Sequence, residues 1–167
     1  MTVGRLSEDD VARAAEFLLE ASAAGRLIDG LPLDCTPETI EDAYAIQAAI
    51  FTARESGAAK GWYVGAANPD MQRQLGLDEA FSARWRTDRF LPSGAEVSHH
   101  GALPTALEAE ITFCLGQDLP PRDSDYHHEE VADAVESMHA SIEVVITCFS
   151  DWLNQRPLSL IAEGGPE

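Results

Sequence analysis

Two apolar segments that each contain glutamate place the strongest constraint on the fold of this chain. In residues 107–113 (LEAEITF) apolar and polar side chains alternate, and Glu108 and Glu110 are two positions apart. Alternate side chains of a β-strand share a face, so the pattern predicts a strand with both carboxylates on one side and the apolar residues on the other. Residues 141–145 (SIEVV) predict a second strand, which carries Glu143.

These three carboxylates predict a metal site. Two neighbouring carboxylates repel each other unless a cation lies between them or one of them takes up a proton. A third carboxylate from an adjacent strand gives an all-oxygen site, which suits Mg²⁺ or Mn²⁺. The alternative is that Glu108 and Glu110 form the solvated face of an edge strand and that Glu143 is exposed. If Glu143 is buried, it needs a partner.

The charge balance limits the classes of ligand. The 167 residues include 11 Lys and Arg against 29 Asp and Glu, a net charge of −18, and suit one domain or one domain with a helical arm. The absence of clustered basic residues argues against nucleic-acid binding, which needs contacts to phosphates. An anionic substrate is repelled by the bulk charge, so its site would need a bound cation.

The compartment is predicted from the cysteines and from the absence of long apolar segments. Cys114 and Cys148 lie in apolar runs and are expected to be buried thiols; together with Cys35 they lack metal-type spacing, which indicates a reducing compartment. The N-terminus lacks the apolar core of a signal peptide, and no segment approaches the ~20 apolar residues of a membrane span. We therefore expect a cytoplasmic protein without a membrane partner.

Local patterns predict an α+β chain. Helices are expected over 7–25 and 36–57, followed by a strand over 61–65 and a short helix over 68–76. Periodicity is weak over 77–100, and 116–128 is expected to be a polar loop. A helix over 129–139 and a strand over 142–148 complete the prediction.

The histidines are weaker site candidates. The pairs His99-His100 and His127-His128 invite a zinc interpretation, but no cysteine or carboxylate spacing of the zinc type surrounds them. His139 is expected to end the helix over 129–139 rather than to act as a base.

Four blocks, in order and spacing, resemble one family. They are 42–47 (DAYAIQ); 61–65 with 68–76 (NPDMQRQLG); 107–111 with 118–120 (DLP); and 141–145 with 151–152 (DW). Together they look like the 2-keto-4-pentenoate hydratases of the fumarylacetoacetate hydrolase superfamily, which are close to the 4-oxalocrotonate decarboxylases.

The resemblance implies a fold and an activity. It implies a helical N-terminal arm over 1–58 and a mixed β-roll core over 59–167, incomplete here because family chains continue further. It also implies a divalent metal, Mg²⁺ or Mn²⁺, held by Glu108, Glu110 and Glu143, which chelates a small anionic 2-oxo acid. The resemblance further implies that the enzyme adds water to a dienol substrate, a reaction of aromatic catabolism. A homo-oligomer, or association with a related chain, is expected.

The chain departs from the family pattern at two places. Tyr63 stands where the family has a lysine, and a tyrosine with a pKa near ~10 transfers protons poorly at neutral pH. Lys60, three residues earlier, is expected on the opposite face of the strand. Tyr63 and Lys60 are the candidates for proton transfer, although packing is an equal alternative for Tyr63. Residues 146–148 (ITC) replace a family Asp-Ser-Arg and remove an ion pair or substrate contact.

Two functions are therefore predicted. The first is a divergent metal-dependent hydratase-like enzyme; a decarboxylase or hydrolase of the superfamily would need the same metal. The alternative is a truncated, non-catalytic homologue that acts as a subunit or partner of a full-length hydratase or 4-oxalocrotonate decarboxylase. An unrelated binding module is disfavoured by the four ordered blocks.

Overall fold

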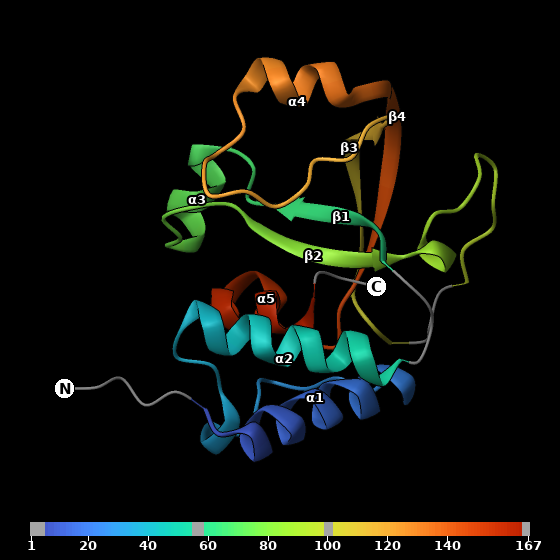
Figure 1. Ribbon diagram of the computed structural model, residues 1–167. Helices are drawn as coiled ribbons and strands as arrows, with labels where there is room; N and C mark the ends of the chain where they lie inside the picture. Colours follow the sequence, from blue (N-terminus) through green and yellow to red (C-terminus); the bar gives the residue numbers. More distant parts are fainter. Residues whose placement is uncertain (1–5, 55–58, 99–101, 165–167) are drawn as a thin grey trace. The chain divides into compact units, whose positions relative to one another are not determined.

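The computed structural model describes residues 6–54, 59–98 and 102–164, and Figure 1 gives its elements in chain order. The chain divides into two compact units, one of Met1–Thr105 with Val145–Glu167 and one of Ala106–Val144. Helices and antiparallel strands confirm the predicted mixture of α and β structure. The closed β-roll and the boundary between 58 and 59 stay predictions.

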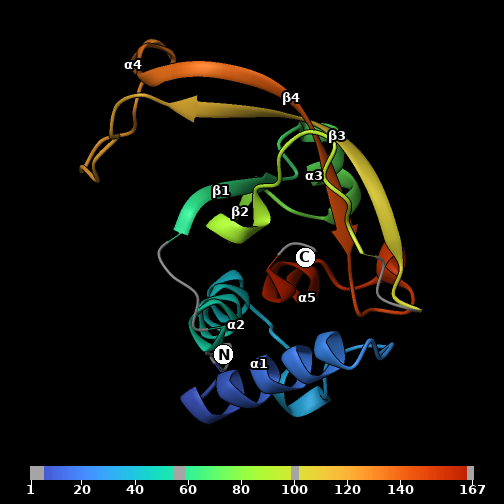
Figure 2. The ribbon, with the colours of Figure 1, turned by 90° about the vertical axis from the view of Figure 1, so that its right-hand side faces the viewer.

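Three helices pack together in the first unit. They are α1 (Glu8–Ala23), α2 (Ile40–Ala53) and α5 (Pro157–Glu163), with α2 in contact with both of the others (Figure 2). Ser7 caps α1 in a reciprocal box with Asp10, and Thr39 caps α2 by accepting a hydrogen bond from the backbone of Asp42. Their buried side chains, among them Ala14, Leu18, Ile46, Ile50 and Ile161, form the main apolar core together with Phe149, which lies between β4 (Val135–Ile146) and α5 in sequence. The two N-terminal helices agree with the sequence prediction, whereas α5 was not predicted.

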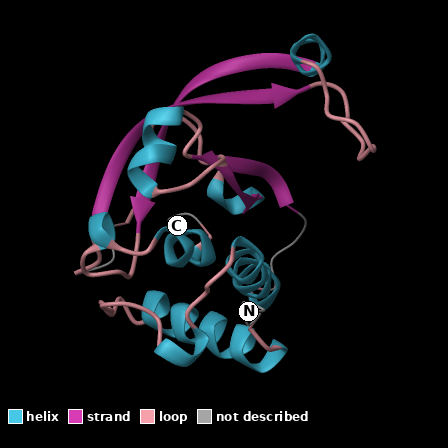
Figure 3. Ribbon diagram, turned by 90° about the vertical axis from the view of Figure 1, so that its left-hand side faces the viewer, coloured by secondary structure: helices cyan, strands magenta, loops and turns pink. Residues whose placement is uncertain are grey.

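The first unit also contains a two-stranded antiparallel sheet (Figure 3). Strand β1 (Ala59–Gly65) pairs with β2 (Phe81–Arg86), with an irregularity between Ala59 and Gly61. Helix α3 (Pro69–Leu75) lies between them in sequence and ends at Gly76, which has a φ of 65°. The predicted strand and short helix are confirmed. Strand β2 was missed because its alternating residues (FSARWR) are too few to stand out in a polar stretch.

Gln47 of α2 fixes the sheet and α5 to the helices. Its amide nitrogen donates hydrogen bonds to the carbonyl of Ser82 in β2, at 3.2 Å, and to the carbonyl of Ile161 in α5, at 3.0 Å. The Ser82 backbone N–H donates to the hydroxyl of Tyr44, at 3.1 Å. Because Gln47 is buried, these bonds satisfy polar groups that water cannot reach. One side chain thus sets the positions of two elements far apart in sequence.

The second unit is built on a long hairpin. Strands β3 (Thr105–Leu115) and β4 (Val135–Ile146) form a two-stranded sheet, and α4 (His128–Ala134) leads directly into β4. The backbone N–H of Gly116 donates to the carbonyl of Ala134 at 2.9 Å, and the hydroxyls of Thr112 and Ser141 lie 2.8 Å apart. Gly116 thus pairs with Ala134 and the earlier Thr112 with the later Ser141, so the two strands run antiparallel.

The predicted helix over 129–139 is wrong in its second half. Helix α4 ends at Ala134, and Val135 already has extended backbone angles. Residues 136–139 (ESMH) form part of β4, because cross-strand pairing with β3 outweighs a weak helical pattern. His139 therefore lies on a strand and not at a helix end, and its Nε2 is 2.9 Å from the hydroxyl of Ser137. The second predicted strand begins earlier and ends at Ile146, not at 148.

Two of the remaining sequence expectations concern the cysteines and the membrane. Cys35 and Cys148 are buried, and burial raises the pKa of the Cys148 thiol, which stays protonated. Cys114 is exposed, so its predicted burial is wrong; it lies near the end of β3, where the neighbouring residues are exposed as well.

None of the helices in the described ranges is long and apolar enough to cross a membrane.

Candidate metal centre

The hairpin brings the three predicted glutamates together. Glu108 and Glu110 lie on β3 and Glu143 lies on β4, and one carboxylate oxygen from each is within 4.8 Å of the other two. Strand alternation gives the first pair a common face. The contact between Thr112 and Ser141 fixes the register, because these hydroxyls lie two positions from Glu110 and Glu143 on the same face. The whole cluster belongs to the second unit.

Glu143 is the buried member of the cluster. It is only 5% exposed, and neither of its carboxylate oxygens has a hydrogen-bond partner among the described residues. Glu108 and Glu110 are less buried. The alternative of an exposed strand face is therefore wrong for Glu143. Burial, and then the negative charges of Glu108 and Glu110, raises the pKa of Glu143 to about 7.

This arrangement fits a hard divalent cation. An ionised carboxylate that is buried without a partner costs several kcal/mol, so Glu143 must either carry a proton or be compensated by a positive charge. Three carboxylates within reach of one point supply the all-oxygen donor set that Mg²⁺, Mn²⁺ and Ca²⁺ prefer. Soft metals that select thiolate or imidazole ligands are disfavoured by the same donor set.

Tyr63 and Lys60, the two candidates for proton transfer, lie in the first unit. The ring of Tyr63 stacks on Trp85, with centroids 5.8 Å apart and an interplanar angle of 10°, and meets Phe81 edge-on at 6.0 Å. The ammonium of Lys60 lies 5.6 Å from the centroid of the Phe90 ring. These contacts give both side chains a packing role. Their part in catalysis stays a prediction.

Glu163 forms an anchor that the sequence analysis missed. Its carboxylate accepts hydrogen bonds from the hydroxyl of Thr147, at 2.6 Å, and from the backbone N–H of Cys148, at 2.9 Å. Burial raises the pKa of Glu163, while these hydrogen bonds oppose the rise. Thr147 and Cys148 belong to the segment that replaces the family Asp-Ser-Arg. Thr147 and Cys148 thus have the Glu163 carboxylate as their partner, and a contact across 15 or 16 residues leaves no local sequence signal.

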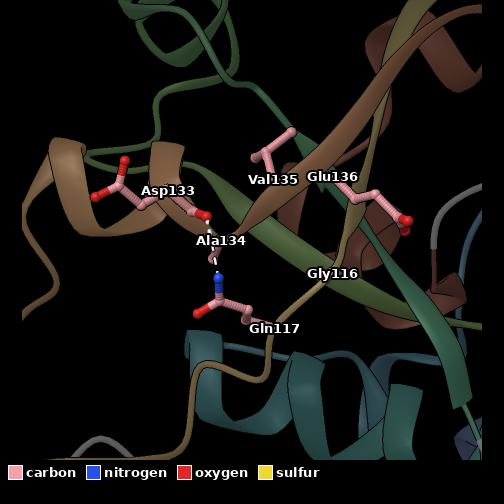
Figure 4. A pocket seen from close by; sticks show the side chains of 6 residues that line it. All are labelled: Gly116, Gln117, Asp133, Ala134, Val135 and Glu136. Atoms are coloured by element: carbon pink, nitrogen blue, oxygen red, sulfur yellow. Dashed lines mark hydrogen bonds between the residues drawn. The ribbon is translucent and has the colours of Figure 1, made fainter.

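The histidines that invite a zinc interpretation form no metal-ligand group within the described residues. His127 and His128 lie at the start of α4, and they belong to no group of three metal ligands in the part of the chain that the structure describes. His99 and His100 lie outside the described residues. A small pocket lies where β3 ends and β4 begins, and Gln117 donates across it to the carbonyl of Asp133 at 3.5 Å (Figure 4). None of the three clustered glutamates lines this pocket.

The sequence is similar to several bacterial hydratases. A 2-keto-4-pentenoate hydratase of Paraburkholderia xenovorans (strain LB400) is 30% identical over 142 residues, which are 83% of this chain and 52% of the relative. The TodF product hydratase of Pseudomonas putida (strain F1) is 30% identical over 159 residues, 88% of this chain and 57% of the relative. The chain thus spans little more than half the length of these relatives. No protein-family profile matches the chain.

A solved structure shares the fold. The 4-oxalocrotonate decarboxylase of Pseudomonas putida G7, complexed with magnesium and adipate, superimposes with a TM-score of 0.82 at 22% identity. The match covers 96% of this chain and 61% of the decarboxylase. The same decarboxylase complexed with calcium and acetate gives a TM-score of 0.80.

Proposed function

Since the chain is a homologue of the 2-keto-4-pentenoate hydratases, within the fumarylacetoacetate hydrolase superfamily, we propose that it is a metal-dependent, hydratase-like protein that binds a small anionic 2-oxo acid. The observation that carries this proposal is the pair of buried, unpartnered oxygens of Glu143 beside Glu108 and Glu110. The solved decarboxylase structures that contain magnesium or calcium support a divalent ion of this kind.

Glu108, Glu110 and Glu143 would hold the ion, which we propose is Mg²⁺ or Mn²⁺. When bound, a divalent cation supplies a Lewis acid that stabilises negative charge on an oxygen of a 2-oxo acid. The protein's part is to desolvate the site at Glu143 and to keep three ionised carboxylates together. Because the net charge of −18 repels an anionic substrate, the bound cation would supply the local attraction for it.

The proposed reaction is the addition of water to a 2-hydroxydienoate in aromatic catabolism, with the chain acting in the cytoplasm. It requires a group that moves a proton to or from carbon. We propose Lys60 or Tyr63 for this role, in place of the family lysine. A phenol with a pKa near ~10 is mostly protonated at neutral pH, so Tyr63 would act as a proton donor more readily than as a base.

A second candidate function is a non-catalytic homologue that associates with a full-length hydratase or 4-oxalocrotonate decarboxylase. The aromatic stack of Tyr63 on Trp85 favours it, because that stack uses for packing the position at which the family carries a lysine. The two functions share the metal site and differ in turnover. Consumption of 2-hydroxypentadienoate by the metal-loaded chain would exclude the non-catalytic function.

The first test is calorimetric titration with Mn²⁺, with and without oxalate as a 2-oxo acid analogue. We expect one Mn²⁺ per chain and tighter binding when oxalate is present. Glu108→Gln and Glu143→Gln should each weaken Mn²⁺ binding by at least about tenfold, since each removes a charged ligand. Glu136→Gln is the matched control, because it makes the same change at an exposed position of β4.

The outcomes separate the possibilities. A folded wild-type chain that does not bind Mn²⁺, or equal affinity in the wild type and both site variants, would remove the proposed centre. Mn²⁺ binding that is insensitive to oxalate would retain the metal and contradict the 2-oxo acid as its ligand.

A further inference from the structure

Helix α2 and strand β2 run side by side in the same direction (Figure 1). One contact joins Gln47 of α2 to the carbonyl of Ser82 in β2. Further along both elements, the guanidinium carbon of Arg84 lies 4.5 Å from the centroid of the Phe51 ring. The contacts therefore advance together along the helix and the strand, so the two elements end close to each other.

This alignment gathers arginines at the ends of the two elements. Arg54 follows the last residue of α2, three positions after Phe51, and Arg86 is the last residue of β2, two positions after Arg84. Three helical residues rise about 4.5 Å and two strand residues about 6.6 Å, so the two steps are similar in length. Arg89 ends the short turn that follows β2. We call Arg54, Arg86 and Arg89 the arginine cluster.

The three guanidinium groups of the arginine cluster act on one another. Burial, and then the positive charges of Arg89 and Arg86, lowers the pKa of Arg54 to about 10. Burial, and then the charge of Arg86, lowers the pKa of Arg89 as well. A chain with only 11 Lys and Arg and a net charge of −18 thus places three positive charges where they repel. Such repulsion costs free energy, and an anion bound among the three charges would relieve it.

Local contacts account for part of the arginine cluster. Arg54 stands at the C-terminal end of α2, where the helix dipole favours a cation. Arg86 donates from Nε and Nη2 to the two carboxylate oxygens of Asp88, at 3.1 and 2.7 Å. Glu163 also attracts Arg54, although its carboxylate already accepts two hydrogen bonds. Three positive charges against these two carboxylates leave an excess of positive charge even when both are ionised.

The arginine cluster suits a phosphate group. A guanidinium is a planar fork of donors that matches phosphate oxygens and keeps its charge at all working pH values. The three arginines come from a helix end, a strand end and a turn, so they can donate to different oxygens of one tetrahedral group. The bond to Asp88 uses only Nε and Nη2 of Arg86 and leaves Nη1 outside it. Because the chain as a whole repels anions, a phosphate needs several cations close together.

We propose that the arginine cluster is a binding site for the phosphate group of a small molecule. The cluster lies entirely in the first unit, whereas the three glutamates belong to the second. The inference uses neither the metal nor the 2-oxo acid. Phosphate binding can therefore fail while metal binding stands, and metal binding can fail while phosphate binding stands.

The test is calorimetric titration of the full chain with inorganic phosphate, in EDTA and at low salt, so that no bound metal contributes and screening is weak. We expect one phosphate per chain. Arg54→Gln and Arg89→Gln should each weaken binding at least about tenfold, because each removes a charged donor. Arg73→Gln, at an exposed arginine of α3, is the charge-matched control and should bind as the wild type does. Asp88→Asn should bind phosphate more tightly, because it removes the carboxylate that competes for Arg86.

A second titration, with glycerol 3-phosphate, distinguishes the sources of the phosphate group. Tighter binding of the ester than of inorganic phosphate would assign the site to phosphate esters, and equal or weaker binding would assign it to free phosphate; both support the site. Circular dichroism reports whether the variants fold, and the exposed Arg89 carries the test if Arg54→Gln does not. A folded wild-type chain that binds neither compound would overturn the proposal. So would equal affinity in the wild type and the folded arginine variants, or no gain in Asp88→Asn.

Discussion

Replacing Glu143 by glutamine should stabilise the metal-free chain at alkaline pH. The folded chain holds Glu143 with a pKa of about 7 against an ordinary value of 4.5, chiefly because of burial. Between these two values the folded chain keeps a proton that the unfolded chain has released. Stability therefore falls as pH rises through this window, and stays lower above it. The difference of about 2.5 pH units corresponds to about 3 kcal/mol of lost stability.

Glutamine has nearly the same shape and cannot ionise, so Glu143→Gln should recover most of this loss. In a chain of this size, about 3 kcal/mol corresponds to a rise in Tm of roughly 5–10 °C. The assay is thermal and urea unfolding in EDTA at about pH 5 and about pH 8.5. The variant should be more stable than the wild type at the higher pH, and the difference should shrink toward the lower one.

At the higher pH, excess Mn²⁺ should make the wild type more stable than Glu143→Gln, because the ion stabilises only the chain that binds it. The exposed Glu136→Gln provides the control and should change neither profile. Equal stability of wild type and Glu143→Gln in EDTA at about pH 8.5 would refute the reasoning, since it would mean that the folded chain does not bury an uncompensated charge at this position.

Three further predictions concern the site and its support. The affinity for Mn²⁺ should fall by about tenfold for each pH unit below 7, because a proton on Glu143 competes with the ion; calorimetry that shows a flat profile would contradict this. Tyr63→Ala should lose about 2 kcal/mol of stability in urea unfolding and should lose more than Tyr63→Phe, since phenylalanine keeps the stack on Trp85; equal losses would mean that the hydroxyl matters more than the ring. Gln47→Ala should lose about 1–3 kcal/mol, because the carbonyls of Ser82 and Ile161 lose their shared donor, and Gln74→Ala on the exposed side of α3 is the control that should change stability little.

The sequence alone determined the features that depend on near neighbours. The helix starts at Ser7 and Thr39 follow from side chains that bond to backbone groups within one turn. The common face of Glu108 and Glu110 follows from the pleat of one strand. The family resemblance was also available from the order of four short blocks, and the homologous hydratases confirm it.

Only the tertiary structure decided the features that depend on distant partners. Helix α5 and strand β2 take their positions from Gln47, which lies far from both in the chain. Strand β4 begins at Val135 because pairing with β3 overrides the local helical pattern. The burial of Glu143, and its placement within reach of Glu108 and Glu110, depend on the register of two strands joined by a long connection. That register is set by cross-strand contacts such as Thr112 with Ser141, which no local pattern specifies.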